Sequence, residues 1–214
     1  MANYNNEAEQ AAAIKQWWQK NAKPVITGVV VGVGLLTGWQ FWQTHQLNQG
    51  MAASDRFVEL QKVVEAGQVA SIVADAEQLL QDYPATVYAV LAARQVAKAM
   101  YQQGDKAGAR SWLERALASA DDVPVMQQAI RMQLAELLID LQAWQDAEHV
   151  LQAAATEETF AAQMAELRGD LAYHQGDLSA ARAAYQQAAD QSREPDTLLT
   201  LKISNLGSDT SQEE

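Results

Sequence analysis

The sequence predicts an all-α protein in which a single N-terminal transmembrane helix precedes a domain of repeated helical hairpins. Three observations support this prediction. Residues 24–42 contain no charged side chain, the rest of the chain is rich in Ala, Gln and Leu at helical spacing, and turn residues recur every 34 to 38 positions. No segment alternates polar and apolar residues over the length that a β-strand needs.

Composition excludes several classes of function. The 214 residues include 15 Lys and Arg against 27 Asp and Glu, and the net charge of -12 argues against a nucleic-acid-binding protein. The chain has no Cys, which excludes disulfides, thiolate zinc sites and Cys nucleophiles. The three His residues lie far apart, and no phosphate-binding loop or serine-nucleophile motif is present. We therefore predict no catalytic residues, no metal site, no cofactor and no enzymatic activity.

Residues 1–23 are predicted to be a cytoplasmic tail, and residues 24–42 the transmembrane helix. Nineteen helical residues span about 28 Å, close to the ~30 Å hydrocarbon core of a bilayer. Aromatic residues of the kind found at membrane interfaces border the segment on both sides: Trp17, Trp18, Trp39, Phe41 and Trp42. A cleaved signal peptide is the alternative, but its apolar core is usually only about 7–15 residues long. We expect the segment to be retained as an anchor.

The distribution of Lys and Arg predicts the orientation of this anchor. Lys15, Lys20 and Lys23 precede the span, and no Lys or Arg follows it until Arg56. Because short cytoplasmic segments carry the excess of positive charge, the N-terminus is expected in the cytoplasm and the residues after about 43 on the other side of the membrane.

Four glycines within the span form two small-xxx-small patterns: Gly28 with Gly32, and Gly34 with Gly38. Such patterns let a second membrane helix approach closely, so these glycines are candidates for a transmembrane helix contact. The alternative is that Gly is simply common in membrane helices.

Residues 43–66 are predicted to be a membrane-proximal helical joint that continues from the span, with a break near Gly50. The repeat domain is predicted over residues 67–206. The polar residues 207–214 have little to bury and are predicted to be a disordered tail.

Equivalent turns of the repeat domain are predicted at four positions, which stand 37, 38 and 34 residues apart: Gly67, Gly104, Gln142 and Gly176. Five residues after the last three of these turns comes a small residue, followed by a larger one four positions on and another small one after seven. These residues are Ala109, Leu113 and Ala116; Ala147, Leu151 and Ala154; and Ala181, Tyr185 and Ala188. Small residues let paired helices approach closely, so three units are predicted, preceded by a degenerate first unit.

This pattern resembles the tetratricopeptide repeat, a helix–turn–helix unit of about 34 residues. The best match runs from Gly169 to Ala188 and includes the Gly-Asp pair that begins at Gly176. The consensus Trp and Leu at the start of each unit are mostly missing, and Gln142 stands where a turn glycine is expected. The fold class is therefore predicted to be a tetratricopeptide-like domain of about three to four units.

Across almost its whole length the sequence is similar to the YfgM family of bacterial inner-membrane proteins. The features that carry this resemblance are Ala22-Lys23-Pro24, the glycine-rich span from Val31 to Trp39, Trp42-Gln-Thr-His-Gln46, Leu167-Arg-Gly-Asp170 and Leu201-Lys-Ile-Ser-Asn-Leu206. The resemblance implies a single-pass protein of the bacterial inner membrane, with its N-terminus in the cytoplasm and a tetratricopeptide-like domain in the periplasm. It further implies an ancillary subunit of the SecYEG translocon. It also implies work with the membrane-anchored periplasmic chaperone PpiD and contact with exported client proteins.

The tetratricopeptide arrangement also places certain residues on the concave side, which is lined mainly by the first helix of each pair. The predicted partner-binding groove comprises Arg94, Lys98, Tyr101, Met132, Glu136, Asp140, Glu166, Asp170, Tyr173 and His174. It grades from basic to acidic and fits docking of an extended or helical segment. The alternative is an ordinary solvated inner face.

Two functions remain open from the sequence. The first is a non-enzymatic, inner-membrane-anchored interaction module that links the translocon to periplasmic chaperones for exported proteins. The second is a membrane-anchored regulatory scaffold that sequesters an envelope or cytoplasmic signalling factor.

Overall fold

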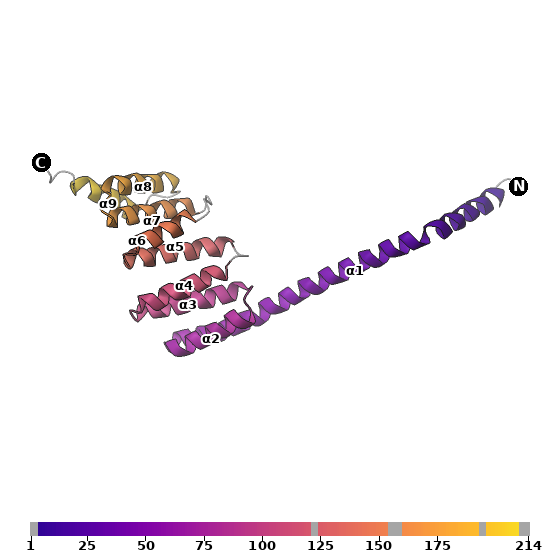
Figure 1. The fold of residues 1–214 in the computed structure, drawn as a ribbon, viewed down its shortest axis with the longest axis horizontal. Helices are drawn as coiled ribbons and strands as arrows, with labels where there is room; N and C mark the ends of the chain where they lie inside the picture. Colours follow the sequence, from indigo (N-terminus) through magenta and orange to yellow (C-terminus); the bar gives the residue numbers. More distant parts are fainter. Residues whose placement is uncertain (1–3, 121–123, 154–159, 193–195, 210–214) are drawn as a thin grey trace. The chain divides into compact units, whose positions relative to one another are not determined.

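The computed structural model describes residues 4–120, 124–153, 160–192 and 196–209, and within them every regular element is an α-helix. The chain divides into two units, residues 1–49 and 50–214. The helices shown in Figure 1 are α1 (Tyr4–Glu65), α2 (Val69–Asp82), α3 (Val87–Gln102), α4 (Lys106–Ala118), α5 (Pro124–Asp140), α6 (Trp144–Gln152), α7 (Ala161–His174), α8 (Leu178–Gln191) and α9 (Thr197–Asp209). The prediction of an all-α fold is confirmed.

The first unit consists of α1 up to Gln49, and its apolar side chains face outward along the predicted span. Val31, Leu35 and Leu36 are all more than half exposed. The Thr27 and Thr37 hydroxyls donate to backbone carbonyls four residues earlier, which satisfies these polar groups within the helix. Among the described residues, α1 is the one helix long and apolar enough to cross a membrane.

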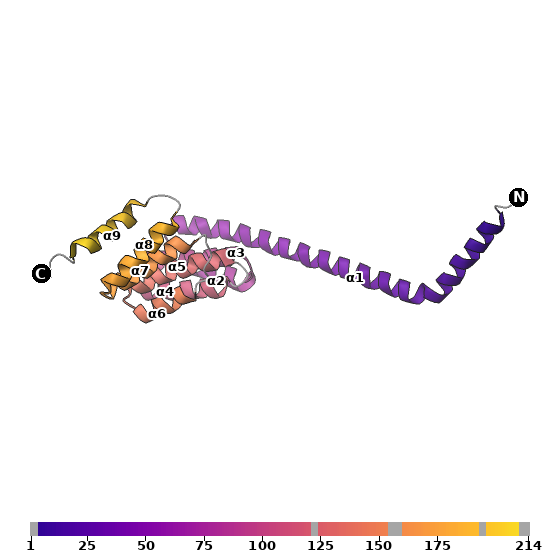
Figure 2. The same ribbon diagram turned by 90° about the horizontal axis from the view of Figure 1, so that it is seen from above.

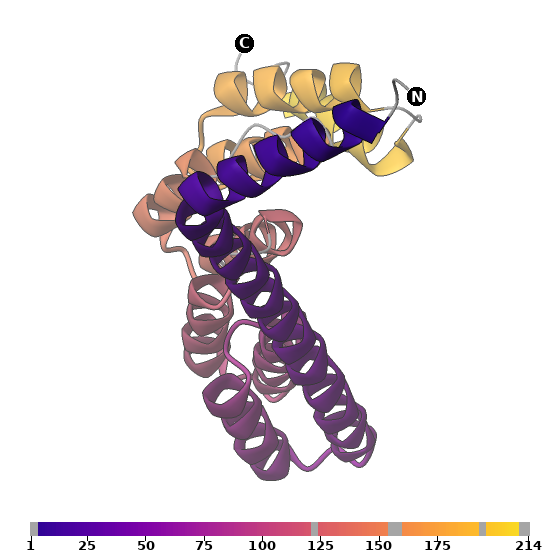
Figure 3. The ribbon, with the colours of Figure 1, turned by 90° about the vertical axis from the view of Figure 1, so that its right-hand side faces the viewer.

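The second unit begins within α1, because residues 50–65 of this helix belong to the core of the repeats. Ala53, Phe57 and Leu60 are buried, and the ring of Phe57 lies 5.8 Å from that of Tyr88 on α3. Residues 50–65 of α1 form the first hairpin with α2 (Figure 3). The repeat core therefore reaches into the segment assigned above to the joint. The expected break near Gly50 is wrong, since α1 passes through this residue as helix.

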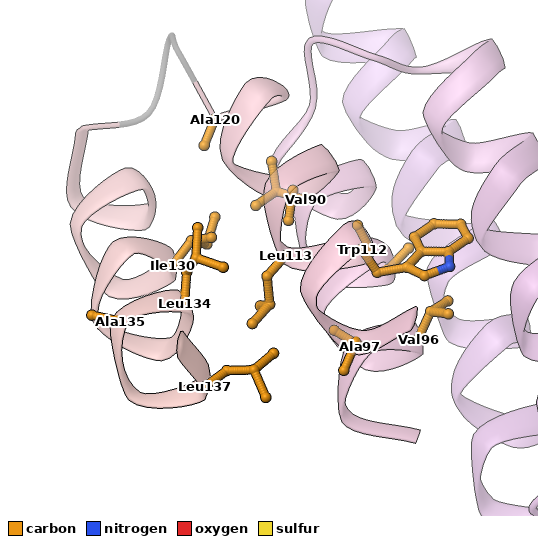
Figure 4. Packing of buried hydrophobic residues seen from close by; sticks show 14 of the residues in the cluster. Val90, Val96, Ala97, Trp112, Leu113, Ala120, Ile130, Leu134, Ala135 and Leu137 are labelled. Carbon is orange, nitrogen blue, oxygen red and sulfur yellow. The ribbon is translucent and has the colours of Figure 1, made fainter. Parts of the chain in front are cut away.

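Three further hairpins follow, α3 with α4, α5 with α6 and α7 with α8, stacked in chain order (Figure 1). Their contact faces bury small and branched apolar side chains. In Figure 4, Leu113 of α4 points toward Ile130 and Leu134 of α5, and all three are less than 7 % exposed. The buried residues form two clusters: one runs from the end of α1 to α7, and the second joins α7 with α8 and α9. Neighbouring repeats thus bury their apolar faces against one another, as expected for a repeat protein.

The pattern of small and large residues in the second helix of each pair is confirmed by burial. Each small residue that follows a turn by five positions is buried, and so is each larger residue four positions on. These residues are Ala109, Leu113, Ala147, Leu151, Ala181 and Tyr185. Ala116 and Ala188 are also buried, whereas Ala154 lies outside the described residues.

The four predicted turns share one backbone conformation. Gly67, Gly104 and Gly176 have φ values of 70°, 85° and 83°, and Gln142 has a φ of 59°. After the last three turns, the next N–H donates to the carbonyl five residues earlier, the hydrogen bond of the Schellman motif. Gln142 therefore takes the place of a turn glycine, as its position in the repeat predicted.

Replacing Gln142 by glycine is expected to stabilise the domain by about 0.5–1 kcal/mol, because an L-residue in the left-handed region is strained. Gly104→Ala introduces the same strain, although its new Cβ would meet no atom within 4 Å, and is expected to destabilise by about 1 kcal/mol. Thermal unfolding of the full chain in detergent micelles, followed by circular dichroism, measures both. Shifts of the same sign in the two variants would contradict this account.

Helix α9 follows the last hairpin and packs beside α8 (Figure 2). The Asp196 carboxylate caps its start by accepting from the N–H groups of Leu198 and Leu199, and Leu199 and Leu206 are buried. Arg182 of α8 donates to the carbonyl of Leu206. The helix continues to Asp209, so its last three residues enter the segment 207–214 that the sequence predicted to be disordered. The remaining residues of that segment lie outside the described part.

Candidate partner-binding groove

Two adjoining cavities lie along the first helices of successive hairpins. The first has a volume of about 460 Å³ and is lined by side chains of α3, α4 and α5. The second has a volume of about 470 Å³ and is lined by α5, α7, the turn at Gln142 and the first residue of α6, Trp144. Because Glu136 and Asp140 of α5 line both cavities, we treat them as one surface, called the groove below.

The α3 side of the groove carries two cations, Arg94 and Lys98. The Arg94 Nε donates to Gln133 Oε1 on α5 at 2.9 Å, which holds the guanidinium in place. Arg94 is half-buried, and this burial lowers the pKa of its guanidinium, although the group stays charged at neutral pH. Neither cation forms an ion pair within the described residues.

Two hydrogen bonds to Asp140 join α3, α4 and α5 in the middle of the groove. Both Lys106 Nζ and the Tyr101 hydroxyl donate to Asp140 Oδ2, at 2.7 and 3.1 Å. The hydrogen bond from Lys106 lowers the pKa of Asp140, and the bond from Tyr101 adds to this effect. The charge of Asp140 is therefore already matched within the protein.

The α7 side of the groove is acidic in sequence but holds a lysine from α9. Lys202 Nζ lies 2.7 Å from Glu166 and 2.7 Å from Asp170. Burial alone would lower the pKa of Lys202, but its hydrogen bonds with the two carboxylates outweigh burial and raise it. The hydroxyl of the buried Tyr185 donates to Asp170 at 2.7 Å. Helix α9 thus supplies one positive charge to the two carboxylates on this side of the groove.

Glu136 is the groove carboxylate without an ion-pair partner in the described part of the chain. Desolvation by the groove walls raises the pKa of its carboxyl, and the negative charges of Asp170 and Glu166 raise it further, against a smaller opposing effect of Lys202. Its ionised form is therefore less favourable in the folded protein than in the unfolded chain.

Glu136→Gln is expected to stabilise the full chain at pH 7 by a few tenths of a kcal/mol, about 1 °C in Tm, because solvent screens this exposed carboxylate. A carboxyl whose pKa is raised by folding destabilises the folded state above that pKa, and this effect disappears as pH falls below the unfolded value. The difference in Tm between variant and parent should therefore vanish near pH 4. Asp190→Asn, on the exposed side of α8, is the control and should not show this pH dependence. A constant difference across pH would contradict the prediction.

Aromatic side chains lie at the α7 end of the groove. His174 stacks on the ring of Trp144, with ring centroids 5.9 Å apart and planes inclined by 13°. Both residues line the second cavity. Tyr173 contacts His174 edge-on at 5.7 Å but does not line the groove.

The structure brings most of the sequence-predicted groove residues together. Seven of the ten line the two cavities: Arg94, Lys98, Tyr101, Glu136, Asp140, Asp170 and His174. Met132 instead packs against the core, Glu166 binds Lys202, and Tyr173 lies outside the cavities.

Sequence reasoning missed five polar or aromatic residues of this region: Gln95, Lys106, Gln133, Trp144 and Lys202. Lys202 had a detectable signal, because Leu199, Ile203 and Leu206 follow helical spacing and predict a packed helix around it.

The remaining predicted sites stay predictions. A Cβ added at any of the span glycines, Gly28, Gly32, Gly34 or Gly38, would meet no atom within 4 Å, so there is room for a partner helix but no contact to assign. Among the described residues, no group of His, Asp and Glu has the arrangement of a metal site.

The fold and the groove define a helical repeat protein of the tetratricopeptide class with an apolar N-terminal helix. A family model described as "Tetratricopeptide repeat-like domain" matches residues 15–208. Among solved structures, one titled "MamA RS-1 ArsTM double mutant" aligns with a TM-score of 0.58 over 75 % of this chain and 85 % of that chain. Its sequence identity is 14 %, so this likeness concerns the fold alone.

Three curated relatives align with nearly the full chain, and each is named "Ancillary SecYEG translocon subunit". The protein of Haemophilus influenzae is 31 % identical over 96 % of this chain and 100 % of its own length. That of Escherichia coli is 30 % identical over 95 % and 98 %, and that of Aggregatibacter actinomycetemcomitans 27 % identical over 96 % and 100 %. The chain belongs to the YfgM family.

Proposed function

We propose that this protein is a non-enzymatic, membrane-anchored interaction module of the SecYEG translocon. In this proposal α1 holds the repeats at the inner membrane, and the groove binds a segment of a partner that works on exported proteins. The membrane-anchored chaperone PpiD is the partner that membership of the YfgM family favours.

The observation that carries this proposal is the groove itself. The relatives that align with this chain over almost their full length are named for the translocon. A surface on adjacent repeats, with charges that have no ion-pair partner among the described residues, is suited to binding a peptide segment. Anchoring confines the groove to a thin layer at the membrane, which raises its effective concentration toward other membrane proteins.

The proposal also places the repeats in the periplasm, and the three lysines before the span support this orientation. Because the chain has no Cys, single thiols can be introduced at Asp55 and Asn6 and treated in intact cells with a membrane-impermeant maleimide. Labelling at position 55 and protection at position 6 are expected. The reverse pattern would overturn the orientation.

Site-specific cross-linking in intact cells tests the partner. A photoreactive amino acid replaces Gln95, which lines the groove, or Gln186, which is exposed on α8. Adducts with a SecYEG subunit or PpiD are expected from position 95 and not from the matched position 186. Equal adducts from both positions would remove the groove from the proposal, and none from either would contradict the translocon assignment.

A further inference from the structure

Some charges of the groove have no counter-charge within the described part of the chain. The other carboxylates that line the two cavities each have a lysine partner: Asp140 pairs with Lys106, and Asp170 shares Lys202 with Glu166. The charges left over are two cations on α3 and one carboxylate on α5: Arg94, Lys98 and Glu136. All three lie on the same surface, on the first helices of successive repeats.

Two of these charges, on Arg94 and Glu136, are in an unfavourable environment in the isolated domain. Arg94 is partly desolvated, and the one hydrogen-bond partner that its side chain has among the described residues is the neutral Gln133. Glu136 lies near the negative charges of Asp170 and Glu166. A ligand that supplies the missing counter-charges relieves both costs, whereas a ligand of the wrong charge increases them.

We propose that the groove binds a single peptide segment of a partner protein that carries an acidic and a basic side chain at a fixed spacing. The acidic side chain lies against Arg94 and Lys98, and the basic side chain lies against Glu136. This inference rests on the proposed function and specifies the charge pattern of the segment. A purely anionic ligand fits less well, because Glu136 repels it.

Helix α9 provides an internal example of the second contact. Its Lys202 reaches two carboxylates of α7 at 2.7 Å, so a lysine on a packed segment can bind the acidic face of a repeat helix. Glu136 on α5 lies close enough to this face for Lys202 to affect its pKa. The proposed partner segment would supply a positive charge to Glu136, as α9 supplies the Lys202 ammonium group to the carboxylates of α7.

Selection from a random 12-residue phage-displayed peptide library on the full chain in detergent micelles tests the proposal. The selected peptides are expected to share an Asp or Glu and a Lys or Arg at one fixed spacing. For the best synthetic peptide, fluorescence anisotropy should show binding weakened about tenfold by Glu136→Lys and by Lys98→Glu.

Two variants with matched charge changes are the controls. Asp190→Lys on α8 and Lys62→Glu on α1 lie outside the groove and are expected to change affinity less than twofold. A peptide whose basic residue is replaced by Glu should regain affinity for the Glu136→Lys variant and not for the parent, which isolates this one contact.

Peptides without the charge pair, the absence of selected peptides, or equal weakening by the control variants would overturn the inference. Failure of the proposed function is distinguishable. If position 95 gives translocon adducts but selection yields no charge pair, only the inference fails. If selection yields the charge pair but position 95 gives no adduct, the translocon assignment fails and the ligand chemistry stands.

Discussion

Gly169→Ala is expected to destabilise the repeat domain by about 2 kcal/mol, lowering its Tm by about 4–8 °C. Gly169 is buried in α7, where α7 and α8 approach closely, and a Cβ at this position would overlap the ring of Tyr185. This ring is 3 % exposed, and its hydroxyl is held by Asp170. The ring cannot move without opening the contact between the helices, and the better helix propensity of alanine, about 1 kcal/mol, offsets only part of the cost.

Thermal unfolding of the full chain in detergent micelles measures this effect. Gly50→Ala is the matched control, because Gly50 is also helical but its added Cβ would meet no atom within 4 Å. The control is expected to be neutral or slightly stabilising. If both substitutions leave the Tm unchanged, the close approach of α7 and α8 is not required by the fold.

Lys202→Met is expected to destabilise the domain by about 2 kcal/mol and to loosen α9. Lys202 and its two partners, Glu166 and Asp170, are each about a quarter exposed. Removing the cation leaves two carboxylates close together on α7 with no counter-charge, and the cost of a broken partly buried pair exceeds that of a surface pair. Methionine keeps most of the apolar part of the lysine side chain, so the loss of stability measures mainly the removal of the charge.

Thermal unfolding gives the total effect, and hydrogen exchange of the α9 amides shows whether that helix opens first. Lys62→Met is the control, since its pair with Glu59 is 65 % exposed on both sides and is worth about 0.5 kcal/mol or less. Because the folded protein raises the pKa of Lys202, its contribution is complete at neutral pH and is lost only when alkaline pH passes through that raised pKa. Equal losses from the two lysine variants would contradict the assigned role of α9.

The repeat architecture could be predicted because its signals are local. Turn glycines, the caps at Asp105 and Asp177, and the small residues of each second helix all act within one hairpin, so sequence spacing reveals them. The equivalence of Gln142 with three glycines was predicted from its spacing alone. The side chain is wrong for that turn, so the repeat geometry prevails over local preference.

The composition of the groove was less accessible to sequence reasoning, because its charges are decided between repeats. Tyr101 and Asp140 are 39 residues apart, and Lys202 is 32 residues from Asp170. The acidic end of the groove was predicted from the sequence of α7 alone. Nothing in that helix indicates that a lysine of α9 pairs with its carboxylates. Glu136 could be placed on the inner face from the sequence. Whether a lysine among the described residues pairs with its carboxylate depends on the positions of Lys106 and Lys202 in the folded protein.

The burial of Ala53, Phe57 and Leu60 in the first hairpin has a practical consequence for dissecting this protein. A soluble fragment made by cutting at residue 67, at the glycine turn, would lose these three residues from the buried cluster to which Ile72 and Ala76 of α2 belong, and would expose an apolar surface prone to aggregation. The cut that preserves the folded body falls upstream of Gly50. Limited proteolysis of the membrane-bound protein should therefore stop upstream of Gly50, and the released domain should keep residues 50–65 of α1.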